Sequence, residues 1–371
     1  MTSGWTVDPA LRFGCVGCTA CCRGWLVQLD QRFLERFDEA ALRQAAPPLP
    51  PDLPLFVREP GSGPDAPVYL AQRERRCVML EADGGCRIHR VLGLEAKPET
   101  CRQYPLLYLR QPTGGRIALR RSCCGSVACW ESGPLVAAEL PRLLAEPGFS
   151  PHLDDPWRLT LVPGRELTGE PRQRWLSAAR AVVDGAVGPF AALRGLAVLL
   201  GQRPAPATDA EVQPQLLATF VRLLPWLRTL VLLEQEAGEE PDDLPPQPAL
   251  FTLGRRGVCE LRRALDARPP LLLLAPTAAR VAPELSRYLR HFLGQYLEAA
   301  EYRPFPDLAA ALGSLAALLP PLLWVTSTEP PAVRLAFLGS TLARLLRSVY
   351  PAGVGLDGQV LDDLRACLAA L

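Results

Sequence analysis

The chain has 371 residues, of which 49% are hydrophobic, and 40 Lys and Arg side chains balance 39 Asp and Glu side chains for a formal net charge of +1. This near-neutral charge lacks the basic excess of a nucleic-acid binder, so we expect no nucleic-acid partner. The length allows two domains or one large one, with room for a sizeable core.

The first ten residues, Met-Thr-Ser-Gly-Trp-Thr-Val-Asp-Pro-Ala, contain neither the basic region nor the apolar stretch of a secretory signal. We therefore expect a cytoplasmic protein. Thiols stay reduced in that compartment, so clustered cysteines are expected to be metal ligands rather than a disulfide framework.

The most informative feature is the cysteine loop that follows. It reads Cys15-Val-Gly-Cys18-Thr-Ala-Cys21-Cys22, and ten of the twelve cysteines lie in the first 129 residues. Two-residue spacing lets thiolates converge on one metal ion or cluster. The loop therefore predicts a metal site.

Three further cysteine segments come next in the chain. Residues 30–46 between them and the loop are predicted to be helical, because apolar side chains recur on one broad stripe. Because the loop by itself does not complete a four-ligand site, we expect it to lie near the later cysteines. The further candidate ligands are Cys77, Cys86, Cys101 and Cys123.

A β-hairpin is predicted next, with strands over 106–110 and 116–121 around a Pro-Thr-Gly-Gly turn. It would return Cys123 toward Cys101. The remaining two cysteines, Cys259 and Cys367, lie in helix-like sequence and are expected to be small buried hydrophobic side chains.

Residues 135–371 are rich in Leu and Ala with helical periodicity, which predicts a bundle of six to eight helices. Residues 308–328 carry no charge and approach the length of a membrane span. Pro320 and Pro321 interrupt them, so we expect a buried bundle helix that ends at the prolines, and no membrane span.

The fold expected overall is mainly α. A cysteine-rich metal-binding N-terminal part with a short β-hairpin, residues 1–134, precedes a helical bundle, residues 135–371.

Two kinds of metal site fit the cysteine set. The first three loop cysteines match the bacterial ferredoxin run, but its fourth position falls at Trp25, so a remote cysteine would complete an iron–sulfur cluster of the 4Fe-4S type. Zinc is the alternative, with His89, three residues after Cys86, as an added candidate ligand. Because adjacent side chains tend to point apart, Cys22 is expected to face away from Cys21 and to serve a second metal or a bridge.

These motifs resemble the CxxCxxCC (YkgJ-type) cysteine-cluster family, described as zinc- or iron-chelating. They resemble its relative, the flagellin lysine-N-methylase family, in more of their residues. The resemblance covers the loop, the segment from Cys77 to Cys86, and Cys101-Arg-Gln-Tyr-Pro. It includes Gly24-Trp25 after the double cysteine. The sequence departs from it where the family has a Ser-Cys-Pro-Glu-Val-Ala-like segment, since the chain has Ser122-Cys-Cys-Gly-Ser-Val-Ala128.

The resemblance implies a protein lysine N-methyltransferase that uses S-adenosylmethionine and acts on flagellin or another surface protein. Methyl transfer needs a group that takes the amine proton, and Tyr104 and Asp30 are the candidate catalytic residues. Two alternatives stay open. One is a non-catalytic metal-binding or electron-transfer module, and the other is a helical interaction protein with a zinc-stabilised N-terminal part.

Overall fold

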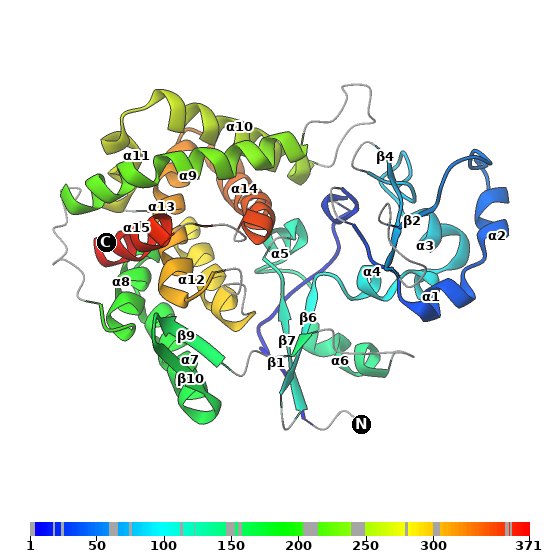
Figure 1. The fold of residues 1–371 in the computed structure, drawn as a ribbon, viewed down its shortest axis with the longest axis horizontal. Coiled ribbons are helices and arrows are strands. Elements are labelled where there is room, and N and C mark those ends of the chain that lie inside the picture. The colour runs from blue at the N-terminus through cyan, green and yellow to red at the C-terminus, as the bar shows by residue number, and fades with distance from the viewer. Residues whose placement is uncertain are drawn as a thin grey trace.

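The protein is mainly helical, as expected, with a few short strand pairs (Figure 1). We call residues 4–145 the N-terminal lobe and residues 158–371 the helical lobe. The computed structural model describes residues 4–17, 19–23, 26–58, 66–73, 76–111, 114–121, 123–145, 153–154, 158–202, 214–238, 249–278, 281–299, 305–352, 356 and 358–371.

A mixed four-stranded sheet in the order β1-β7-β6-β8 supports the N-terminal lobe. The predicted hairpin is confirmed, because β6 and β7 pair antiparallel with Leu106 opposite Leu119. The outer strands β1 and β8 run parallel to their neighbours. The strands are β1 (Trp5–Val7), β6 (Leu106–Gln111), β7 (Gly114–Leu119) and β8 (Leu153–Asp154).

The helices on either side of residue 134 pack on different lobes. Helix α6 (Val136–Ala145) follows that residue but packs on the N-terminal sheet, where Val136 is buried with Leu11 and Tyr108. Helix α5 (Cys124–Ala128) precedes it but joins the core of the helical lobe through Val127. Strand β8 also comes after residue 134 and extends the N-terminal sheet.

The cysteine segments lie in the outer half of the N-terminal lobe, around a separate small core that includes Phe33, Leu42, Met79 and Ile88. Short helices and two-stranded ribbons surround this core (Figure 1). They are α1 (Gln31–Arg36), α2 (Glu39–Gln44), β2 (Phe56–Arg58), β3 (Val68–Leu70), β4 (Gln72–Arg73), β5 (Arg76–Cys77), α3 (Arg87–Leu92) and α4 (Glu99–Gln103), with 3-10 turns η1 (Ala20–Cys22) and η2 (Leu94–Ala96).

The single helix predicted over residues 30–46 is wrong, because the structure has two helices there. Phe37 ends the first helix in an extended conformation, and the side chain of Asp38 accepts a hydrogen bond of 2.8 Å from the backbone N–H of Ala41. An aspartate that caps a helix N-terminus offers the backbone an alternative to continuing the preceding helix.

Nine helices and one β-hairpin form the described part of the helical lobe, against the six to eight helices expected. Cys367 is fully buried in its last helix, as predicted, whereas Cys259 is only half-buried. The elements are β9 (Arg158–Val162), β10 (Arg165–Thr168), α7 (Gly169–Gly185), α8 (Pro189–Leu199), α9 (Pro214–Gly238), α10 (Ala249–Ala267), α11 (Pro270–Ala278), α12 (Pro283–Glu298), α13 (Leu308–Ser327), α14 (Pro331–Ala352) and α15 (Gly358–Ala369).

Helix α13 is the centre of this lobe, and it runs through Pro320 and Pro321 instead of ending there. The prediction of its end was wrong because tertiary packing overrides local propensity. Each proline costs a helix interior about 3 kcal/mol. Each fully buried leucine contributes about 1.5–3 kcal/mol, and all the leucines of α13 are buried.

Two described helices are long and apolar enough to cross a bilayer. The stretch in α13 is 94% buried inside the protein, and the stretch Pro214–Leu232 in α9 is 39% buried. The burial of α13 agrees with the expected bundle-core helix.

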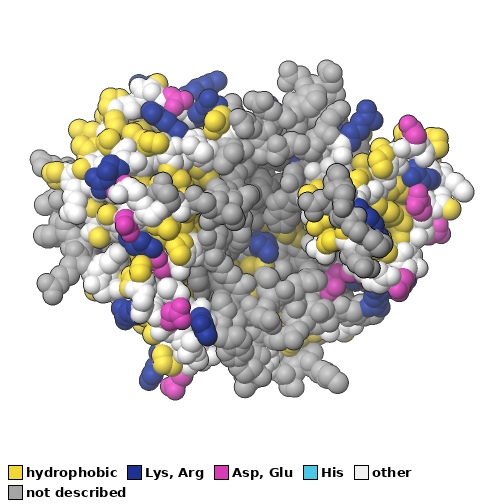
Figure 2. All heavy atoms as spheres, viewed as in Figure 1, with side chains coloured by type: hydrophobic (Ala, Val, Ile, Leu, Met, Phe, Trp, Pro, Cys, Tyr) yellow, Lys and Arg dark blue, Asp and Glu magenta, His cyan; other side chains and the backbone are white. Residues whose placement is uncertain are grey.

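The surface of the protein carries both signs of charge. On the face in Figure 2, basic and acidic side chains of the described residues are interspersed.

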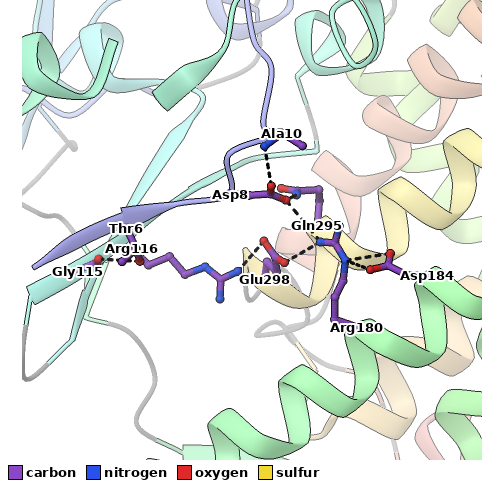
Figure 3. Close-up of polar contacts among 9 residues, drawn as sticks. All are labelled: Thr6, Asp8, Ala10, Gly115, Arg116, Arg180, Asp184, Gln295 and Glu298. Carbon is purple, nitrogen blue, oxygen red and sulfur yellow. Dashed lines mark hydrogen bonds and ion pairs between the residues drawn. The ribbon is translucent and has the colours of Figure 1, made fainter. Parts of the chain in front are cut away.

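A network of charged side chains joins the lobes (Figure 3). Glu298 on α12 accepts from Arg180 of α7 at 2.7 Å and from Arg116 of β7 at 2.6 Å. Gln295 Nε2 on the same helix donates to Asp8, just after β1, at 3.0 Å. Strands of one lobe are therefore tied to helices of the other through partly buried polar contacts.

His291 lies beside this network, with its ring 5.7 Å from that of Trp130. Burial lowers the pKa of His291 to about 4, and the nearby charges of Arg121 and Arg180 act in the same direction. The folded protein therefore holds this histidine neutral, while the unfolded chain protonates it near its ordinary pKa of 6.5.

The free energy of unfolding is therefore expected to fall as the pH drops from about 6.5 to about 4, by up to about 3 kcal/mol from this residue. Denaturant unfolding at several pH values in that window tests this. His291→Gln should flatten the dependence, and His89→Gln, at an exposed position on α3, should not. An unchanged profile in His291→Gln would contradict this account.

Candidate metal centre

A backbone bridge brings the first cysteine segment onto the second. Arg23 pairs antiparallel with Arg76 at the start of β5. Cys22 and Cys77 each adjoin this bridge in the chain, so the bridge brings them close to each other. The loop turns tightly before this bridge, where the Cys22 N–H donates to the Thr19 carbonyl at 2.8 Å.

The segment from Cys77 to Cys86 folds back on itself. The Leu80 N–H donates to the Cys77 carbonyl at 2.9 Å, and Leu80 forms a bridge with Cys86. The turn at Gly84, with φ of +85°, lies against the loop, because a Cβ added there would be 3.3 Å from Thr19 Cγ2. Loop and turn are therefore packed on each other.

Cys101 comes from the short helix α4, and Asp30 holds that helix in place. One Asp30 carboxylate oxygen caps α1 by accepting from the Phe33 N–H at 2.8 Å. The other accepts from the Glu99 N–H, at the start of α4, at 3.4 Å. Both oxygens of Asp30 thus serve backbone groups, and the side chain has a positioning role.

These contacts create a cavity of about 60 Å³, which we call the thiol pocket. One water molecule needs roughly 10–15 Å³ on this measure, so the pocket has room for a bound group. Tyr104 and Lys97, the only lysine of the chain, also line it. Its cysteines are Cys21, Cys22, Cys77, Cys86 and Cys101.

Electrostatics inside the pocket keep its buried thiols protonated. Burial raises the pKa of Cys77 to about 11 and that of Cys101 to about 12. The charges of Cys86 and Cys21 raise both values further, and Lys97 opposes the shift. These sulfurs share one low-dielectric space, so a thiophilic cation that enters it would displace their protons.

The expectation that Cys22 points away from Cys21 is wrong. Both line the thiol pocket, and their sulfurs are 3.9 Å apart. The two residues lie in the 3-10 turn η1, where consecutive side chains are about 120° apart and not on opposite faces as in a strand, so both can reach the same side of the loop.

Other expected ligands have different surroundings. Cys15 is exposed and Cys123 is buried near α5, and neither lines the thiol pocket. Cys18 and Trp25 lie outside the described residues. Sequence reasoning missed Lys97, although its status as the single lysine was a signal that could have found it.

The donor set fits a soft metal. The ten cysteines described with their side chains are all reduced thiols, and thiolates select zinc and iron–sulfur clusters. Within the described ranges, no three Cys, His, Asp or Glu side chains are already gathered in metal-binding geometry. Rotation of the thiols about their Cα–Cβ bonds would be needed to bring them onto one ion.

No protein-family model matches the chain, and neither the curated proteins nor the solved structures give a match.

Gly84→Ala is expected to open the thiol pocket, because the methyl group presses on Thr19 at a strained backbone position. Alkylation of Cys77 and Cys101, followed by mass spectrometry, should become about fivefold faster, which corresponds to about 1 kcal/mol.

Gly93→Ala is the matched control, because Gly93 has a similar φ of +89° but no atom within 4 Å of the added Cβ. Both variants should lose about 1 kcal/mol of stability from left-handed strain. Equal alkylation rates in the two variants would contradict the proposed packing of the loop on the turn.

Proposed function

We propose that the chain is a metal-centre protein whose thiol pocket binds a zinc ion or an iron–sulfur cluster. The observation that carries this proposal is the meeting of five cysteines from three separate segments in one largely apolar pocket. A disulfide framework would join such thiols, and the ten cysteines described with their side chains are reduced.

The chemistry of the pocket supports four-thiolate ligation. Cys77, Cys86 and Cys101 supply three ligands, and either Cys21 or Cys22 supplies the fourth. Zinc and 4Fe-4S clusters both take four cysteines. The positive charge of Lys97 offsets part of the negative charge that such a site accumulates.

Metal content after anaerobic purification tests the proposal. Wild-type protein should contain zinc by elemental analysis, or iron and sulfide with a broad visible absorption. Cys77→Ser/Cys101→Ser should lose most of the metal and, because metal ligation contributes to folding, should also unfold more readily.

Cys259→Ser is the matched control, since Cys259 lies on α10 and outside the thiol pocket. It should keep its metal. Wild-type levels of metal in Cys77→Ser/Cys101→Ser would sink the proposal for this pocket.

A second candidate function is methyl transfer to protein lysines. The observation that favours it is Tyr104, whose side chain lines the same pocket as the thiols. In this reaction the neutral lysine nitrogen bonds to the methyl carbon of S-adenosylmethionine as the sulfonium C–S bond breaks, and the amine proton passes to a base. Asp30 has no place in this candidate mechanism, since both its oxygens accept from backbone N–H groups.

Mass spectrometry of flagellin or another surface protein, after incubation with labelled donor and metal-loaded protein, tests this candidate. Methyl groups should appear on lysines. Tyr104→Phe should slow transfer about a hundredfold with metal content retained, as for loss of a general base. Tyr69→Phe is the control, because Tyr69 lies on β3 and does not line the thiol pocket, and it should be neutral. Failure to bind the donor in calorimetry, with the metal present, would leave only the metal-binding role.

A further inference from the structure

Three cysteines outside the thiol pocket lie on backbone segments that pack against each other, and we call Cys15, Cys123 and Cys129 the junction cysteines. The sulfur of Cys129 donates to the carbonyl oxygen of Gly14, the residue before Cys15, at 3.5 Å. A Cβ at Gly125 would lie 2.7 Å from the same carbonyl oxygen and 3.5 Å from the sulfur of Cys123. Both thiols therefore approach the peptide that leads into Cys15.

Glycines make this approach possible. A side chain at Gly125 would collide with the Gly14 carbonyl, and one at Gly133 would lie 2.3 Å from Cys129 Cβ. Gly14 itself lies against the Cys129 sulfur, with 3.4 Å between that sulfur and an added Cβ. The chain thus brings its backbone closer to these thiols than other residues would allow.

The junction cysteines differ in exposure in a way that suits an ion-binding site at the surface. Cys123 is buried, Cys129 is half-buried and Cys15 is exposed. An ion could reach the site from solvent, and rotation of the Cys15 side chain would close it. None of the three lines the thiol pocket.

We propose that Cys15, Cys123 and Cys129 form a second metal site that takes a thiophilic divalent cation such as Zn²⁺ or Cd²⁺. The three thiols release their protons to solvent as they bind the ion, and solvent occupies the remaining position. This proposal rests on the same thiol chemistry as the proposed function but on none of the residues of the thiol pocket.

The position of the site assigns it a structural role between the lobes. Cys123 and Cys129 flank α5, and Val127 of that helix packs against α14, where a Cβ at Gly339 would be 2.3 Å from it. Trp130, next to Cys129, meets Tyr288 of α12 edge to face at 5.7 Å. An ion held here would fix the N-terminal segment to the element that docks on the helical lobe.

The test is a Cd²⁺ titration of the full-length, reduced, metal-free protein. Wild-type protein should show two classes of site. Cys123→Ser/Cys129→Ser should lose one class and keep the other, Cys77→Ser/Cys101→Ser should show the converse, and Cys259→Ser should keep both.

The outcomes separate the two sites. Binding that is unchanged in Cys123→Ser/Cys129→Ser overturns the second site and leaves the thiol pocket in place. Binding that survives in Cys77→Ser/Cys101→Ser but not in Cys123→Ser/Cys129→Ser supports the second site and overturns the first. Protein that binds no Cd²⁺ overturns both.

Alkylation of the wild-type protein covers the case in which a variant fails to fold. Cd²⁺ should protect Cys15 and Cys129 from a thiol reagent at least tenfold, although Cys15 is exposed without the ion. Equal labelling of these two residues with and without Cd²⁺ overturns the second site by itself.

Discussion

The backbone bridge between Arg23 and Arg76 is the contact on which the thiol pocket depends. It closes a long stretch of chain and brings Cys22 close to Cys77, so that the first cysteine segment joins the second. The Thr19 side chain then fits beside Gly84, and Arg23 Nε donates to the Thr19 hydroxyl at 2.9 Å. Without this pairing the cysteine loop would have no fixed relation to the later cysteines.

Ionisation of the buried thiols in the thiol pocket costs free energy. Burial raises the pKa of both Cys77 and Cys101 well above neutral, so these thiols are protonated when no cation compensates them. Lys97 is the only lysine in the chain, and it lowers both pKa values. Because these thiols are protonated before a metal ion binds, they must release their protons when they ligate it, which couples metal binding to proton release.

The lobes are joined by polar contacts and by the packing of helix α5 on the helical lobe. Glu298 pairs with arginines from both lobes (Figure 3). The nearby His291 stays neutral. Helix α5 docks on the helical lobe while α6 returns to the N-terminal sheet (Figure 1). The cysteine segments therefore belong to a framework that the helical lobe helps to hold. The junction cysteines lie where these elements cross.

The sequence by itself determined local features, because near neighbours in the chain decide them. The Pro-Thr-Gly-Gly turn with its flanking apolar alternation identified the hairpin of β6 and β7, and the 3.6-residue periodicity identified the helical lobe. The cysteine spacing pointed to metal chemistry through the ligand preferences of thiolates, and that part is still a proposal. Tertiary structure decided what depends on long-range contacts. In the tertiary structure the sulfurs of Cys21 and Cys22 lie close together, and the Asp30 carboxylate accepts hydrogen bonds at the N-termini of two helices. Helix α13 continues through its prolines, and Cys15 and Cys123 lie outside the thiol pocket. Packing and burial act between residues far apart in the chain, and no local pattern records which of them meet.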